Sequence, residues 1–399
     1  MSGWRDVTLG ELCSEGGGGV QTGPFGSQLH AADYVSDGIP SIMPQNIGDN
    51  FLDEDGIARI TESDAQRLSK YRVEYGDIVY SRRGDVEKRS LIRAHNVGWL
   101  CGTGCLRVRL GSESPHDPVF LSYLLGTADV REWIVRHAVG ATMPNLNTSI
   151  LSAVPIAMPE PHVQRAIAEV LGALDDKIAA NTKLIDAAKD LALLSLARHK
   201  PTVPLGSIVE RHKATINPSL VAANEVAHFS LPAFDAGQTA EVTRPVDIKS
   251  SKFEVKQPSV LISKLNPRFP RVWNVAEVPA IPGLASTEFL VLEPSHSSTT
   301  FLWAELLQPS FGATLESKVA GTSGSHQRVR PADLLDTLVV DPREVEPELQ
   351  GKITSVGLLA VQSRAENETL AATRDALLPQ LMSGNLRIKE AEVLVEELV

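Results

Sequence analysis

The sequence has few cysteines, no long apolar run and no basic excess, and each shortage excludes a class of protein. Its 399 residues include three cysteines, Cys13, Cys101 and Cys105, which cannot all pair with one another. We therefore expect reduced thiols in a cytoplasmic protein. No apolar run approaches the roughly 18 residues that span a membrane. The first residues lack a basic segment followed by an apolar core, so we expect neither a membrane partner nor a signal peptide.

The chain also lacks the positive charge that usually accompanies binding to nucleic-acid phosphates. Its formal net charge is -11, and no part of it is basic when 1–158, 159–200, 201–344 and 345–399 are counted separately. Any anion-binding site must therefore be local, formed by a few clustered arginines and lysines rather than by the overall field.

Sequence motifs of catalysis and metal binding are missing. The glycine-rich run at Glu15–Val20 lacks the Gly-Lys-Ser/Thr end of a phosphate-binding loop. Cys101 and Cys105 have no second pair and no histidine at metal-ligand spacing, so we expect buried thiols and no metal site. Leu265–Phe269 resembles the Asn-Pro-Pro-aromatic motif of amino-methylating enzymes but lacks the second proline. We expect a non-catalytic chain without a cofactor of its own.

The sequence is instead dominated by an internal repeat, which is the first feature to look for in a chain of this length. Two long helical patterns, Pro161–His199 and Pro347–Asn385, align at a shift of 186 positions. Gln164 then matches Gln350, and Asn181 matches Asn367. Upstream, "DIVYSRRGD" from Asp77 is echoed by "SVLISKLNP" from Ser259. Each half therefore predicts one β-rich module followed by one long helix.

The modules and the helices differ in their apolar spacing. Short runs such as "DIVYS", "LRVRL", "SVLIS" and "FLVLE" are rich in β-branched residues and are bounded by turn formers, which predicts strands in an α+β module. In the long segments, apolar residues recur at steps of three and four, which predicts an apolar stripe on a helix. The residues that we expect to pair the helices or dock partners are Ile167, Leu171, Leu174, Ile178, Asn181, Ile353, Val356, Asn367 and Leu370.

One long helix cannot bury its own stripe, but two helices of one chain can pack antiparallel as a coiled coil. The predicted fold is a pseudo-two-fold dumbbell with two similar β-rich domains, 1–158 and 201–344. Helices at 159–200 and 345–385 join them, and an acidic tail covers 386–399. Asn181 and Asn367 either fix the register of the helix pair or face water. About 30 helical residues span roughly 45 Å, somewhat more than one turn of duplex DNA.

On these pieces together the chain resembles the specificity subunit of a Type I restriction–modification system. The matching segments are "WRDVTLGEL", "QTGPFGSQL", "GIPSIMPQNI", "GDIVYSRRGD", the stretch Gly140–Leu171 and the closing "LLPQLMSGNLRI". The resemblance implies two target-recognition domains, each recognising one half of a bipartite site on double-stranded DNA. It also implies two methyltransferase subunits that bind S-adenosylmethionine, and an ATP-driven translocase and endonuclease subunit as a further partner.

Several loops carry side chains that suit DNA. Arginine bonds guanine bidentately and neutralises phosphates, and glutamine and asparagine bond adenine. For most of these residues, a structural role in a turn is the alternative. The candidate DNA-binding residues are Gln21, Ser27, Gln28, Gln45, Asn46, Ser81, Arg82, Arg83, Lys88, Lys264, Asn266, Arg268, Arg271, His326, Arg328 and Arg330.

Three other functions remain open from the sequence. The chain is alternatively a scaffold that binds proteins at two similar modules. It is alternatively a specificity-like subunit of a phage-exclusion methylation system without the restriction nuclease. A self-contained nuclease or methyltransferase is disfavoured by the absent motifs.

Overall fold

The computed structural model describes residues 4–140, 143–318 and 327–399. The chain forms two compact units, Met1–Lys177 with Thr369–Val399 (unit 1) and Ile178–Glu368 (unit 2). The long helices α6 (Pro161–Leu196) and α11 (Pro347–Ser383) pass through both units. Each unit therefore contains one β-rich head and one segment of each long helix. The described residues of 1–158 are called head 1, and those of 201–344 are called head 2.

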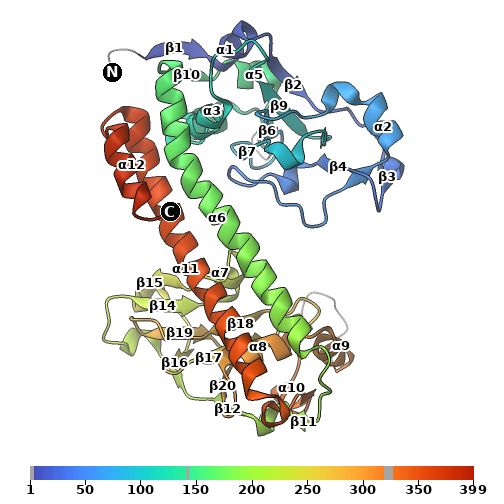
Figure 1. Ribbon diagram of the computed structural model, residues 1–399, viewed down its shortest axis with the longest axis vertical. Helices are drawn as coiled ribbons and strands as arrows, with labels where there is room; N and C mark the ends of the chain where they lie inside the picture. The colour runs from blue at the N-terminus through green and yellow to red at the C-terminus, as the bar shows by residue number, and fades with distance from the viewer. Residues whose placement is uncertain (1–3, 141–142, 319–326) are drawn as a thin grey trace. The chain divides into compact units, whose positions relative to one another are not determined.

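Head 1 is built on two small sheets (Figure 1). The other helices and strands of unit 1 are β1 (Arg5–Thr8), α1 (Leu9–Glu15), β2 (Gly19–Thr22), β3 (Tyr34–Val35), β4 (Ile39–Ile42), β5 (Arg59–Ile60), α2 (Glu62–Arg67), β6 (Ile78–Ser81), β7 (Arg89–Leu91), β8 (Leu100–Cys101), β9 (Cys105–Arg109), α3 (Pro118–Leu124), α4 (Ala128–His137), α5 (Thr148–Ser152), β10 (Pro155–Met158) and α12 (Ile388–Glu396). One sheet has the antiparallel order β2-β9-β6-β7, the other has the order β3-β5-β4-β8 with β4 and β8 parallel, and β1 pairs with β10.

Head 2 repeats this plan. Its elements are β11 (Val203–Pro204), β12 (Val209–His212), β13 (Thr215–Ile216), β14 (Val226–Phe229), α7 (Leu231–Asp235), β15 (Glu241–Thr243), β16 (Lys252–Val255), β17 (Ser259–Ser263), β18 (Val272–Val275), β19 (Gly283–Ser286), β20 (Phe289–Pro294), α8 (Thr299–Leu306), α9 (Pro309–Ser317), α10 (Pro331–Leu335) and β21 (Leu338–Val339). The order β12-β20-β17-β18 matches β2-β9-β6-β7, and the parallel pair β14 and β19 matches β4 and β8. The strands and the repeat predicted from the sequence are thus confirmed as an α+β fold.

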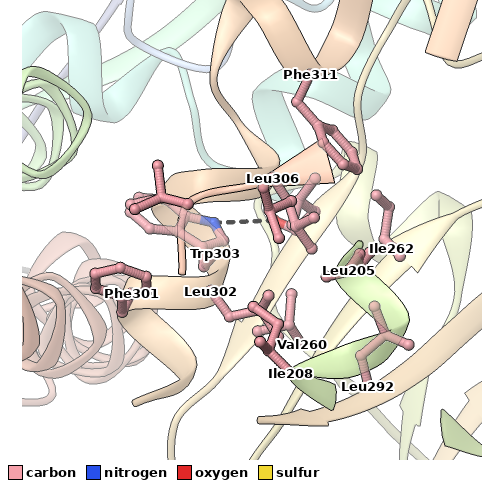
Figure 2. Packing of buried hydrophobic residues seen from close by; sticks show 14 of the residues in the cluster. Leu205, Ile208, Val260, Ile262, Leu292, Phe301, Leu302, Trp303, Leu306 and Phe311 are labelled. Atoms are coloured by element: carbon pink, nitrogen blue, oxygen red, sulfur yellow. Dashed lines mark hydrogen bonds between the residues drawn. The ribbon is translucent and has the colours of Figure 1, made fainter. Parts of the chain in front are cut away.

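The core of head 2 lies where its first sheet meets α8 and the long helices (Figure 2). Val260, Ile262 and Leu292 of the sheet pack with Phe301, Leu302 and Leu306 of α8, all nearly fully buried. Trp303 of α8 donates its indole N–H to the Val272 carbonyl at 3.1 Å, which satisfies the one polar atom of that ring. Ala192, Leu196 and Ile353 belong to the same cluster, so helix segments of unit 2 complete the core of head 2.

The short helices and the long helices start at equivalent caps in the two halves. Asp117 accepts a hydrogen bond from Phe120 N–H at the start of α3, and Ser298 accepts one from Phe301 N–H at the start of α8. Gln164 donates to the Pro159 carbonyl at 2.6 Å, and its match Gln350 donates to the Pro342 carbonyl at 2.7 Å. These two glutamines tie the first turn of α6 and of α11 to the strand region before each helix.

In unit 1 the segments of α6 and α11 are joined by a buried carboxylate. Asp175 of α6 accepts hydrogen bonds from the Tyr123 hydroxyl of α3 and from the Arg374 guanidinium of α11, at 2.5 and 2.7 Å. Ile167, Leu171 and Leu174 of the predicted stripe are buried in this unit, as is Leu370 of α11. The network connects head 1 to both helices.

In unit 2 the two helix segments run antiparallel. Asn181 donates to Glu366 at 2.8 Å, while Ala192 and Ile353 line one groove further along. Asn367 donates to the Ile178 carbonyl at 3.4 Å. Both asparagines therefore bond across the helix pair, which is the register-fixing alternative. Ile353 is buried, and Ile178 and Val356 are half-buried.

Three further findings bear on the sequence predictions. The thiols of Cys13, Cys101 and Cys105 are free and buried, and burial raises the pKa of Cys13 and of Cys101 to about 12. The acidic tail forms α12, with Ala391 and Val395 buried. Within the described ranges, no helix is both long enough and apolar enough to cross a bilayer.

Candidate nucleic-acid interface

In head 1, three loops meet at one edge of the sheet β2-β9-β6-β7. Thr22, at the end of β2, lies opposite Leu106, and Ser81, at the end of β6, lies opposite Cys105, where β9 begins. The loops after β2, after β6 and before β9 are therefore neighbours. The segment 143–147 lies beside the loop after β6, where Asn145 pairs with Arg83. We define the loop edge of head 1 as residues 23–28, 82–88, 102–104 and 143–147.

Backbone hydrogen bonds hold these loops together. Arg82 N–H donates to the Gly104 carbonyl at 2.9 Å, and Gly23 N–H donates to the Cys105 carbonyl at 2.9 Å. A Cβ atom at position 23 would lie 2.0 Å from the Gly102 carbonyl oxygen. Glycine is therefore required there for the first and third loops to approach each other.

Head 2 has the same edge. His212 at the end of β12 lies opposite Val291, and Ser263 at the end of β17 lies opposite Phe289, where β20 begins. We define the loop edge of head 2 as residues 213–214, 264–271, 287–288 and 327–330.

The turn after β6 and the turn after β17 are held by equivalent hydrogen bonds. The Ser81 hydroxyl donates to the Arg83 carbonyl at 2.8 Å, and the Ser263 hydroxyl donates to the Leu265 carbonyl at 3.3 Å. Leu146 N–H donates to the Arg82 carbonyl at 2.8 Å, and Val329 N–H donates to the Lys264 carbonyl at 3.0 Å. Arg82 and Lys264 thus occupy equivalent positions.

Two residues after Arg82 and Lys264, both turns contain a residue with a positive φ. Gly84 has φ 76°, and its equivalent Asn266 has φ 49°. Asparagine adopts this left-handed region more readily than most residues with a side chain. Head 2 therefore keeps the same turn without a glycine, because Asn266 takes the role of Gly84.

The predicted cations divide into two groups by their partners. Arg82, Arg83 and Arg268 have no ion pair among residues 4–140, 143–318 and 327–399, and Arg83 and Arg268 are exposed. The cations paired with carboxylates are Lys88 with Asp85 at 2.7 Å, Arg271 with Asp235 at 2.6 Å, Arg328 with Glu288 at 2.9 Å, and Arg330 with Asp333 at 2.8 Å. The unpaired cations make each loop edge locally positive despite the acidic chain.

Lys264 is held in place by the protein. Its Nζ donates to the Thr287 carbonyl at 2.6 Å, and burial lowers the pKa of its ammonium group. Arg82, its equivalent, is half-buried, and its Nε has no hydrogen-bond partner among the described residues.

Several predicted polar side chains make bonds within the heads. Gln21 accepts from Arg107 at 2.6 Å, and Gln28 accepts from the Tyr71 hydroxyl at 2.9 Å. Asn46 is buried, accepts from Met43 N–H and donates to the Asp53 carbonyl, both at 3.0 Å. Ser27 and Gln45 are exposed. His326 lies outside the described residues.

Two residues of the loop edges were missed at the sequence level. Phe25 and Phe269 have exposed rings, one on each loop edge. Each follows or precedes a proline in a turn, a signal that was available in "GPFG" and "PRFP". Apolar residues are normally assigned to cores, which is why they were not considered.

Unit 2 also has an apolar surface on the long helices. Leu184, Leu191 and Leu194 of α6 and Leu359 of α11 are exposed. A groove of about 470 Å³ between the helix segments is lined by Leu191, Ala192, Leu349 and Ile353. Among the described residues, no group of three or more His, Cys, Asp or Glu side chains is placed to hold a metal ion.

Comparisons with known proteins agree with this arrangement. The fold is similar to the crystal structure of a Type I restriction–modification S subunit from M. genitalium. Its TM-score is 0.57 and its identity 16%, over 95% of this chain and 96% of that chain. The HsdS subunit of Thermoanaerobacter tengcongensis matches with a TM-score of 0.35 and 16% identity, over 96% and 98% of the two chains.

A chain from a structure of complex assembly and conformational transition in the type I R-M system has a TM-score of 0.38 and 17% identity, over 97% and 99%. The likeness of fold rests on the M. genitalium protein. No curated protein sequence matches significantly. Residues 1–190 match the family model of the Type I restriction modification DNA specificity domain. Residues 1–190 therefore carry a Type I restriction modification DNA specificity domain, and the chain shares its fold with the M. genitalium S subunit.

Proposed function

We propose that this chain is a non-catalytic subunit that recognises a bipartite sequence in double-stranded DNA, one half-site with each head. The observation that carries the proposal is the repeated loop edge, where equivalent turns present Arg82 and Lys264 beside unpaired Arg83 and Arg268. Cations that are not already neutralised by carboxylates are available to contact phosphates and base edges. The cations already paired with carboxylates are weaker candidates for contacts with DNA bases.

The differences between the two edges suit two different half-sites. Head 1 presents two adjacent arginines, whereas head 2 has Lys264 and Leu265 at the same positions. Bidentate contact with guanine is a property of arginine, and lysine acts as a point charge. We therefore expect the two heads to recognise different base sequences.

We further propose that the helix pair docks two methyltransferase subunits. The exposed leucines of α6 and α11 and the groove beside them give unit 2 an apolar surface of the kind that protein partners cover. S-adenosylmethionine would bind to those subunits, and ATP to a translocase and endonuclease subunit where one is present. The complex would act on DNA in the cytoplasm.

The test is selection of bound duplexes from a random library by the chain together with its methyltransferase subunit. We expect two enriched half-sites at a fixed separation, and binding that weakens steeply with salt. Arg82→Ala with Arg83→Ala should remove the enrichment of one half-site only. Arg5→Ala is the matched control, because Arg5 pairs with Glu15, which lies beyond the far ends of β2 and β9. Selection without any enriched sequence would favour the protein-binding scaffold instead.

A further inference from the structure

Each loop edge carries one phenylalanine whose ring is mostly exposed. Phe25 is 56% exposed and Phe269 is 64% exposed, whereas Phe120, Phe289 and Phe301 of the two cores are fully buried. Burying the apolar surface of a phenylalanine ring is favourable. An exposed ring at the same edge of both heads is therefore a place where a ligand gains apolar contact.

Both rings are held by rigid turns. Phe269 N–H donates to the Asn266 carbonyl at 2.9 Å, and prolines 267 and 270 flank the turn. In head 1, Phe25 N–H donates to the Gln28 side-chain oxygen at 3.1 Å, and Gln28 N–H donates to the Phe25 carbonyl at 2.8 Å. Because the turns are already ordered, little conformational entropy is lost when the rings bind.

The surroundings of the rings favour DNA over a protein as the ligand. The Arg268 guanidinium lies over the Phe269 ring at 5.9 Å and has no carboxylate partner in the described part of the chain. Gly26 and Ser27, next to Phe25, are small and exposed. At Phe269, an apolar ring beside an uncompensated cation is the combination with which proteins wedge base pairs apart while holding a phosphate. Phe25 is assigned the same role because it lies on the equivalent loop edge of head 1.

We propose that Phe25 and Phe269 insert between adjacent base pairs, one in each half-site. This inference rests on the proposed function and goes beyond it, because it adds recognition of DNA deformability to recognition by arginine. Steps that unstack easily, pyrimidine followed by purine, are then preferred at the two insertion points.

The experiment places 2-aminopurine at successive positions of the selected duplex and measures its fluorescence with the complex bound. Unstacking raises the fluorescence, so we expect a rise at one step in each half-site. Phe269→Ala should abolish the rise in one half-site and weaken binding about 5- to 150-fold, the range for loss of one base–aromatic contact. Phe25→Ala should abolish only the other rise, so each variant is the control for the other. Phe269→Leu should keep part of the signal.

Tyr75→Ala is a further control, because Tyr75 is 63% exposed on the turn that precedes β6, at the opposite end of the strand. A rise caused by a methyltransferase that extrudes its target base persists in all variants. If no rise is lost in the Phe25→Ala or the Phe269→Ala variant, the inference is overturned. The inference is also overturned if the phenylalanine variants keep the DNA affinity of the wild type but no longer bind the methyltransferase subunit. That result would assign the rings to a contact with that protein. If the wild-type complex selects no sequence, the proposed function itself fails.

Discussion

At the scale of single residues, the turns that carry Arg82 and Lys264 depend on one backbone conformation. Gly84 and Asn266 both have positive φ, and a Cβ at Gly84 would meet no atom within 4 Å. The demand at this position is therefore conformational and not steric. A residue that tolerates the left-handed region keeps the turn, and a β-branched residue strains it.

We predict that Gly84→Asn, which copies head 2, leaves the free energy of unfolding nearly unchanged. Gly84→Val should lower it by about 1–2 kcal/mol because the left-handed conformation is strained for a residue with Cβ branching. Gly84→Val should also weaken binding to the selected duplex by displacing Arg83. Chemical unfolding and duplex titration measure both effects, and equal behaviour of the two variants would contradict the account of the turn.

A second residue-scale prediction concerns Glu305 of α8. It is buried, accepts from Val340 N–H at 2.9 Å, and its Oε2 has no partner among the described residues. Burial raises its pKa above the ordinary value of 4.5. Above that pH the unfolded chain loses the proton first, so stability falls as pH rises until the native carboxyl ionises.

Glu305→Gln should therefore abolish this decline and be more stable than wild type above about pH 5. Thermal unfolding from pH 4.5 to 8 measures the difference. Glu316→Gln, at an exposed position of α9, should keep the wild-type pH dependence. A decline that persists in Glu305→Gln would show that another group is responsible.

The sequence indicated several cations of the loop edges, but it did not indicate which of them are paired or which apolar rings are exposed. Arg82, Arg83 and Lys264 were identified because clustered cations stand out in an acidic chain. The sequence did not reveal that Arg271 pairs with Asp235, which lies 36 positions away. Nor did it reveal Phe25 and Phe269, since exposure depends on the loop conformation and not on residue type.

At the scale of elements, the junction of head 1 with the long helices depends on Asp175. Its side chain is 10% exposed and bonds to Tyr123 and Arg374, whereas the neighbouring Asp176 is 74% exposed and pairs with Arg93 at 3.2 Å. Removing this carboxylate leaves the buried Tyr123 hydroxyl without its acceptor. It also takes from the half-buried Arg374 guanidinium one of its two carboxylate partners, the other being Asp375 at 2.8 Å.

We predict that Asp175→Ala lowers the free energy of unfolding by about 1–3 kcal/mol, chiefly because the buried Tyr123 hydroxyl loses its acceptor. Asp176→Ala, the same substitution at an exposed ion pair one residue away, should cost less than about 1 kcal/mol. Urea unfolding of the full chain compares the two. Equal losses would mean that the network does not hold head 1 to the helices.

The elements themselves were largely predictable. Ile78–Ser81 and Ser259–Ser263 are strands where β-branched runs occur, and α6 and α11 begin at the prolines that the repeat aligned. Similar sequence did not give the same structure at Thr8–Glu15, "TLGELCSE", and Pro204–Arg211, "PLGSIVER". The first stretch forms helix α1, whose Thr8 and Glu11 make a capping box, whereas the second enters strand β12 after one short turn. Proline in place of Thr8 removes the capping side chain.

At the scale of the whole molecule, repetition is the main property. The two heads share the strand order of one sheet and the turn that follows an inner strand of that sheet, and one chain joins them to the long helices. If each head recognises one half-site, the two linked binding events reinforce each other on a target that carries both halves. The central claim is that each head recognises its own half of a bipartite DNA target.

Methylome sequencing of cells that carry the chain with its methyltransferase subunit tests this claim most directly. The account predicts one methylated motif with two defined halves and an unspecified spacer. The motif should disappear when the gene is deleted, and one half should relax in the Arg82→Ala, Arg83→Ala variant. Lys264→Ala with Arg268→Ala should relax the other half. Methylation that is unchanged by deletion, or a single contiguous motif relaxed alike by both variants, would contradict it.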